Sequence, residues 1–141
     1  MDYAFEGTSL VTLDAKGRLS LPVRHKDALG GACVVTRHPD GCLLIYPEAN
    51  WGAVRERLAA LPYAGRVLQR IVLGGAERLA PDAHGRILVP SGLRALAGLK
   101  KEAILVGLGN RLELWDREAY AKAESGQLAQ APSSVVQEFN F

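Results

Sequence analysis

An internal repeat constrains the fold of this chain more than any other feature of its sequence. The ten residues Leu-Asp-Ala-Lys-Gly-Arg-Leu-Ser-Leu-Pro at 13–22 return as Pro-Asp-Ala-His-Gly-Arg-Ile-Leu-Val-Pro at 81–90, an offset of 68. Residues 43–46 then match residues 112–115 at an offset of 69, which also aligns Trp51 with Tyr120. Because one register holds over such a length, we predict two copies of a unit of about 45 residues.

Each copy has the pattern of short strands around a tight turn. The apolar and β-branched residues 8–13 predict a strand, and Asp-Ala-Lys-Gly at 14–17 predicts a turn. The alternation that follows directs Leu19 and Leu21 inward and leaves Arg18 outside. Proline then suits the start of a short helix in both copies. The further strands are predicted at 33–36, 42–46, 104–107 and 111–115.

A unit of this length cannot bury enough surface alone, so the two copies are expected to share one core. We predict an α+β fold in which they form a closed or interleaved β structure about a pseudo-twofold axis. The apolar spacing of Trp51, Val54 and Leu58 predicts a helical connection between them. The expected domains are 8–50 and 77–120, joined by a connector at 51–76 and followed by a C-terminal tail at 121–141.

Composition excludes several classes of protein. No apolar run approaches the roughly 18 residues that a membrane span needs, and the first residues lack the pattern of a signal peptide. A cytoplasmic protein with Cys33 and Cys42 as reduced thiols is therefore expected. Seventeen Lys and Arg against fifteen Asp and Glu give a net charge of +2, which argues neither for nor against nucleic acid.

The distribution of charge is more informative than its sum. Residues 1–70 carry nine basic and seven acidic side chains, and residues 71–141 carry eight of each. Within 16–26, Lys16, Arg18, Arg24 and Lys26 occur with no acidic residue among them. Such a run is often only a solvated face, so its meaning depends on its place in the fold.

The turn Asp14-x-x-x-Arg18 allows a structural and a functional interpretation. The two side chains can pair across the turn, which at an exposed site contributes roughly 0–1 kcal/mol. Alternatively, the turn presents Arg18 and Lys16 to phosphates or to guanine in a major groove. Its second copy, Asp82 and Arg86, favours the functional interpretation, because twofold symmetry is common among proteins that bind duplex DNA.

These residues resemble those of the MraZ family, bacterial proteins built of two AbrB-like (SpoVT/AbrB) units. The resemblance covers roughly residues 5–124 and rests on the two turns and on further matches in the same order. These matches are Phe5-x-Gly7, Gly17 to Pro22, Leu43 to Pro47 and Glu113-Leu114-Trp115-Asp116.

The resemblance implies a swapped-hairpin β-barrel built from both copies and a ring-like homo-oligomer. It further implies a nucleoid-associated transcriptional repressor, which binds direct repeats in double-stranded DNA upstream of the division and cell-wall gene cluster that includes its own gene. The expected DNA-binding residues are Lys16, Arg18, Arg24, Lys26, His84 and Arg86. The residues expected to shape the turns are Asp14, Gly17, Asp82 and Gly85.

The sequence gives less support to other functions. An AbrB-like protein-interaction or antitoxin-type module with secondary DNA binding remains the alternative. Cys33, His38 and Cys42, with His25 as a conceivable fourth ligand, lack the usual spacing of a zinc site. Asp14 and Asp82 could act as an acid dyad only if they shared a proton. The arginine four residues after each aspartate is expected to keep it ionised, which argues against such a dyad. We therefore expect no enzyme, cofactor, metal or small-molecule substrate.

Overall fold

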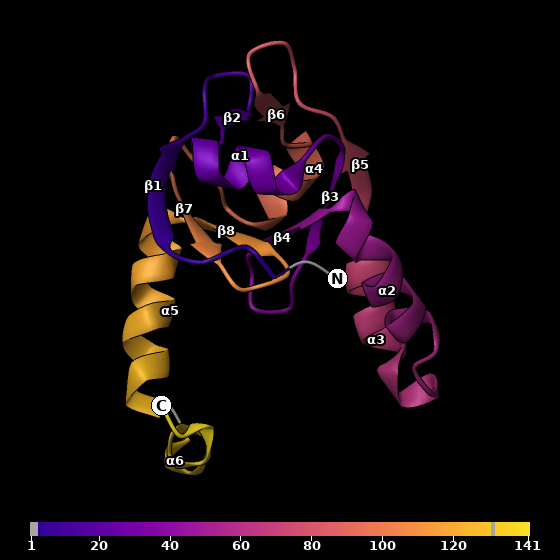
Figure 1. Ribbon diagram of the computed structural model, residues 1–141, viewed down its shortest axis with the longest axis vertical. Coiled ribbons are helices and arrows are strands. Elements are labelled where there is room, and N and C mark those ends of the chain that lie inside the picture. The colour runs from indigo at the N-terminus through magenta and orange to yellow at the C-terminus, as the bar shows by residue number, and fades with distance from the viewer. Residues whose placement is uncertain (1–2, 131) are drawn as a thin grey trace.

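The computed structural model describes residues 3–130 and 132–141; residue 131, within the expected tail, lies outside the described residues. The first repeat contains β1 (Thr8–Thr12), β2 (Arg18–Ser20), α1 (Val23–Leu29), β3 (Cys33–Arg37) and β4 (Leu43–Pro47). The second contains β5 (Glu77–Leu79), β6 (Arg86–Leu88), α4 (Ser91–Leu96), β7 (Glu102–Gly107) and β8 (Leu112–Asp116). Between them lie α2 (Glu48–Ala59), the 3-10 turn η1 (Tyr63–Gly65), α3 (Arg66–Leu68) and the π-helical turn η2 (Gln69–Leu73), and α5 (Arg117–Gln130) and α6 (Ser133–Phe139) follow. Figure 1 shows this α+β arrangement, which confirms the predicted fold class.

The two repeats exchange their outer strands. The six-stranded sheet has the order β1-β7-β8-β4-β3-β5, in which β1 of the first repeat pairs with β7 of the second, and β5 of the second pairs with β3 of the first. The two halves of the sheet meet where β4 pairs with β8. The order is symmetric: if each strand is replaced by the equivalent strand of the other repeat, the same order results when it is read from the opposite edge. The interleaved β structure predicted from the repeat is therefore confirmed.

A second, two-stranded sheet pairs β2 with β6 in antiparallel register. Leu19 faces Ile87 in this pair, and both side chains are fully buried in the main core. On the other side of that core lie inward-facing residues of the larger sheet, among them Val35, Ile45 and Leu105. The predicted alternation is confirmed, because the inward positions of β2 are buried while Arg18 remains partly exposed.

Aromatic pairs repeat along with the backbone. Tyr46 at the end of β4 packs on Trp51 of α2, with ring centroids 5.4 Å apart. At the matching positions, Trp115 of β8 packs on Tyr120 of α5 at 5.8 Å. Each pair anchors a helix to the larger sheet, so these rings help to hold the fold together.

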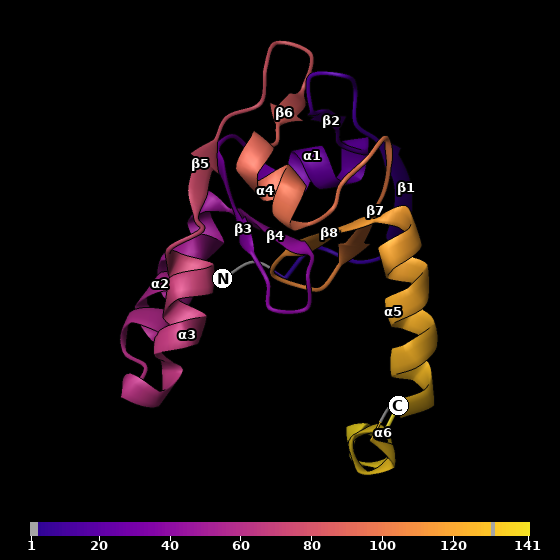
Figure 2. The same cartoon turned by 180° about the vertical axis from the view of Figure 1, so that it is seen from behind.

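The connecting and C-terminal helices lie at the opposite end of the molecule from the turns, whereas α1 and α4 lie beside the turns. Figures 1 and 2 show the loops before β2 and β6 side by side at one end, and α2, α3, α5 and α6 extending at the other. In the C-terminal tail, α6 leaves Val135, Val136 and Phe139 exposed. Within residues 3–130 and 132–141, no helix combines the length and apolar character that crossing a membrane requires.

His25 is a polar residue at an apolar position of the repeat. It lies on α1 at 2% exposure, and the equivalent residue of α4, 68 positions later, is Leu93. Within the described part of the chain, His25 Nε2 has no hydrogen-bond partner, and the nearby aromatic ring is that of Phe5. Burial lowers the pKa of His25 below its ordinary value of 6.5, and the charge of Arg24 lowers it further.

We expect His25 to make the protein less stable in mild acid. Below pH 6.5 the unfolded chain takes up a proton that the native state resists until its lower pKa is reached, so stability falls by up to about 1.4 kcal/mol per pH unit in that window. His25→Leu, which copies Leu93, should remove this part of the pH dependence. Urea unfolding of both proteins between pH 7.5 and 5 measures the difference, and parallel pH profiles would contradict the expectation.

Candidate nucleic-acid interface

The first turn is built around the carboxylate of Asp14. Asp14 Oδ1 accepts the backbone N–H groups of Lys16 at 3.0 Å and Arg18 at 2.9 Å, and Oδ2 accepts Nε–H of Arg18 at 2.6 Å. The backbone closes the same turn, because the N–H of Gly17 donates to the carbonyl of Asp14. One short acidic side chain thereby determines both the shape of the turn and the direction of the Arg18 guanidinium.

The second turn repeats this geometry. Asp82 Oδ1 accepts the backbone N–H groups of His84 and Arg86, each at 2.9 Å, and Oδ2 accepts Nε–H of Arg86 at 2.9 Å. Such agreement between two turns with different residues at the tip, Lys16 and His84, shows that the Asp-to-Arg spacing and the glycine carry the conformation.

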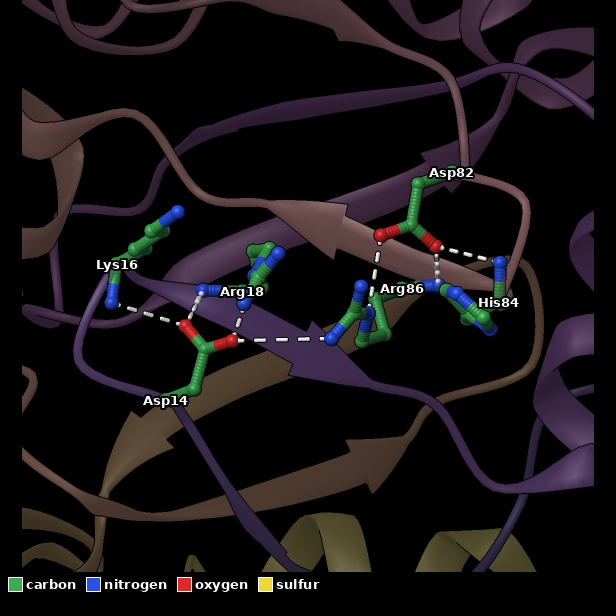
Figure 3. Close-up of polar contacts among 6 residues, drawn as sticks. All are labelled: Asp14, Lys16, Arg18, Asp82, His84 and Arg86. Atoms are coloured by element: carbon green, nitrogen blue, oxygen red, sulfur yellow. Dashed lines mark hydrogen bonds and ion pairs between the residues drawn. The ribbon is translucent and has the colours of Figure 1, made fainter.

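The pairing of β2 with β6 brings the two arginines onto one surface. Ser20 lies opposite Arg86, and Arg18 lies opposite Leu88, so the two arginines are diagonal neighbours on the outer face of this small sheet. Arg86 Nη1 also lies 4.0 Å from Asp14 Oδ2, which connects the two turns directly (Figure 3). We name the surface formed by 14–18 and 82–86 the paired-turn face.

The electrostatics of the paired-turn face argue against an acid dyad. The hydrogen bond from the Arg18 backbone N–H is the largest cause of a lowered pKa at Asp14, and the Arg18 guanidinium lowers it further, against an opposing effect of desolvation. The pKa of Asp82 is lowered in the same way, first by the backbone N–H of Arg86. Two carboxylates that share a proton need one raised pKa. Both acids here are instead held ionised as structural acceptors.

Each turn is also covered by a cation from the other repeat. Gly17 has φ of +87° and lies against the guanidinium of Arg94 on α4, whereas Gly85 has φ of +75° and lies against the ammonium end of Lys26 on α1. Lys26 and Arg94 are equivalent residues of the repeat, 68 positions apart. Glycine is favoured at both turns because φ is positive there, and a larger residue would in addition push the end of the cationic side chain aside.

The predicted site residues are not all brought together. Lys16 and His84 stand at the tips of the turns, and the Lys16 side chain extends away from Asp14 (Figure 3). Arg24 points elsewhere, because its Nη2 donates to Ser9 Oγ at 3.0 Å near the start of β1, the end of that strand remote from the turn. Arg94 was not among the predicted residues. The offset that relates Arg18 to Arg86 also relates Lys26 to Arg94 and was sufficient to find it.

The residues weighed as zinc ligands have other surroundings. Cys33 and Cys42 are buried free thiols, and burial raises the pKa of Cys33 to about 11 and also raises that of Cys42. His38 Nδ1 accepts the backbone N–H of Asp40 at 3.0 Å. Across residues 3–130 and 132–141, no three His, Cys, Asp or Glu side chains form a group suited to a metal ion.

Comparison with known proteins follows the division into two repeats. The model of the family described as "MraZ protein, putative antitoxin-like" matches residues 4–68 and again residues 72–139. The chain belongs to the MraZ family. The resemblance inferred from the two turns is thus confirmed, over nearly the whole length of the chain.

Relatives in this family carry a functional name. The chain is 45% identical over 141 residues to the transcriptional regulator MraZ of Bordetella pertussis, covering 97% of this chain and 99% of that protein. It is 46% identical, with the same coverage, to the transcriptional regulator MraZ of Acidovorax sp. strain JS42, and 42% identical over 144 residues to that of Leptothrix cholodnii, with 99% of each chain covered. The chain therefore belongs to a family in which these relatives are named transcriptional regulators.

We expect Gly17→Ala to damage the paired-turn face more than Gly98→Ala damages the end of α4. Both glycines have positive φ, which costs an alanine roughly 1–2 kcal/mol, but open space surrounds Gly98 while Arg94 covers Gly17. The added methyl must also disturb the hydrogen bond from Arg94 Nε to the Val89 carbonyl. Thermal unfolding measures both losses. Equal losses would show that the Arg94 contact contributes nothing to the turn.

Proposed function

We propose that this protein regulates transcription by binding double-stranded DNA through the paired-turn face. The observation that carries the proposal is the pair of Asp-clamped arginines, Arg18 and Arg86, brought together by the β2–β6 pair. A duplex has approximate twofold symmetry, and a reading surface with the same symmetry fits it. The name carried by the relatives, transcriptional regulator, supports the same function.

The clamps prepare the arginines for DNA. Each carboxylate holds Nε of its arginine, which leaves the Nη groups of Arg18 for a bidentate contact with guanine or for a phosphate, whereas Arg86 Nη1 also lies 4.0 Å from Asp14 Oδ2. Rigid side chains lose little conformational entropy when they bind. Lys16 and His84 at the tips, with Lys26 beside the second turn, add contacts to the phosphate backbone in this proposal. Arg24 contributes less directly, because it is bound to Ser9.

Assembly supplies the affinity that one weakly charged chain lacks. We propose a ring-like homo-oligomer that binds direct repeats in its own promoter, at the nucleoid in the cytoplasm, and represses the division and cell-wall gene cluster. The helices remote from the paired-turn face support self-association, because they expose apolar side chains. These side chains are Tyr63, Val67 and Leu68 near α3 and Val135, Val136 and Phe139 on α6. Several linked subunits then bind repeated sites through a high effective concentration.

An antitoxin-type interaction module is the second candidate, favoured by the antitoxin-like description of the family. Such a module needs a segment free to bind a toxin. Here the second half of the chain supplies β5, β7 and β8 to the shared sheet, so these strands are not free to bind a toxin. A partner protein that binds more tightly than promoter DNA would favour this candidate.

We expect Arg18→Ala to weaken binding to the promoter DNA of its own gene by about 5- to 150-fold, since an arginine contact with a base contributes roughly 1–3 kcal/mol. Arg86→Ala should also weaken it, by a smaller factor if the first turn makes more contacts. Anisotropy titrations over a salt series measure both affinity and salt slope. Arg57→Ala on the outer side of α2 is the matched control and should bind like the wild type. Unchanged binding by both turn variants would overturn the proposed interface.

We also expect a native mass that is a multiple of the 15.2 kDa chain. Val67→Glu with Phe139→Glu should shift the mass toward the monomer, because the substitutions place charge on exposed apolar surface without entering the core. Native mass spectrometry measures the change. A wild-type monomer would contradict assembly while leaving the DNA interface open to its own test.

A further inference from the structure

A groove of about 500 Å³ lies beside the first turn. Asp14 and Gly17 of the turn line one side, and Arg94, Lys100 and Lys101 line the other. The backbone keeps the two sides together, because the N–H of Leu13 donates to the carbonyl of Lys101 at 2.8 Å. A segment of the second repeat is thus fastened to the base of the first turn.

This segment differs between the two repeats. Leu79 of β5 lies 68 residues after its counterpart Val11, but Ala103 of β7 lies 70 residues after its counterpart Cys33, as the strand registers show. The second repeat therefore contains two additional residues between α4 and β7, in the stretch that carries Lys100 and Lys101. The corresponding stretch of the first repeat is Gly30, Gly31 and Ala32, which places no cation beside the second turn.

The charges in the groove favour an anion. The carboxylate of Asp14 is already engaged by Lys16 and Arg18. Lys101 is exposed, and Lys100 reaches Glu118 only at 4.0 Å, with both side chains mostly in solvent. An exposed pair at this distance is weak and is readily exchanged for a stronger acceptor.

We propose that the groove binds a backbone phosphate of the DNA, so that the first turn is held on the duplex more firmly than the second. The inference rests on the proposed function, since it assigns a phosphate contact next to the same turn. Lysines bind phosphate as point charges, and about half or more of the hydrogen bonds between proteins and DNA go to the backbone. Arg94 adds a fixed cation to the lining of the groove, because its Nε is bound to the Val89 carbonyl.

The phosphate contact gives the paired-turn face a direction. Two equal turns bind a duplex equally well in either orientation. The additional phosphate site that Lys100 and Lys101 provide, beside the first turn only, breaks this equivalence, so every subunit lies the same way along the DNA. Direct repeats, unlike inverted ones, require this common orientation of the subunits.

The test compares Lys100→Gln/Lys101→Gln with the wild type in titrations of the promoter duplex over a salt series. The slope of log affinity against log salt should fall in magnitude by about 0.9, because one phosphate is no longer neutralised. Arg57→Gln/Lys122→Gln removes the same charge from exposed positions on α2 and α5 and should keep the wild-type slope. Thermal unfolding checks that both variants fold, which is expected because a side-chain substitution at Lys101 retains the backbone carbonyl that Leu13 needs.

Each outcome bears on one proposal or on both. A reduced slope for the groove variant alone supports the phosphate site. If the groove variant keeps the salt slope of the wild type, the phosphate site is overturned and the paired-turn interface is unaffected. The same conclusion follows if the control variant loses as much of the slope as the groove variant does. If binding of the promoter duplex by the wild-type protein does not depend on salt, both the phosphate site and the paired-turn interface are overturned.

Discussion

The exchange of outer strands between the repeats is the constraint on which the rest of the structure depends. β1 completes the sheet of the second repeat and β5 that of the first, so neither repeat has a full hydrogen-bonded sheet without the other. The same exchange brings β2 against β6 and buries Leu19 and Ile87 between the two sheets. An unpaired strand edge or an exposed core face would be the cost of separating them. Two small repeats are therefore one folding unit.

The paired-turn face follows from this exchange. Each Asp-to-Arg clamp is local, since it closes within five residues. Two other contacts join the repeats: Arg86 lies near Asp14, and each turn is covered by a cation of the other repeat. Strand exchange thus converts two ordinary turns into one rigid, nearly symmetric basic surface. The net charge of +2 conceals this surface, because acidic residues elsewhere balance it and Asp14 and Asp82 are held as internal acceptors.

The repeat was sufficient to predict the fold class, the turns and the main buried residues of β2, because identical spacing implies identical local structure. Lys26 and Arg94 each lie on the turn of the other repeat. Local residue spacing does not predict which repeat a helix packs against, so it could not predict these contacts. Arg24 was expected beside the turn from its position in a basic run, but the helix directs it toward Ser9. The two additional residues near Lys100 could not be predicted from the repeat, because the two copies share no matching residues in that stretch. The strand registers were needed to place them.

Hydrogen exchange of the full chain with and without its promoter duplex tests the central claim most directly, because it reports protection at every segment at once. If the paired-turn face binds the duplex, exchange slows at 13–18 and 81–86, more strongly at the first turn together with 98–101, and changes little in α2, α5 and α6. Slower exchange confined to the helices, with both turns unchanged, would contradict the proposed interface.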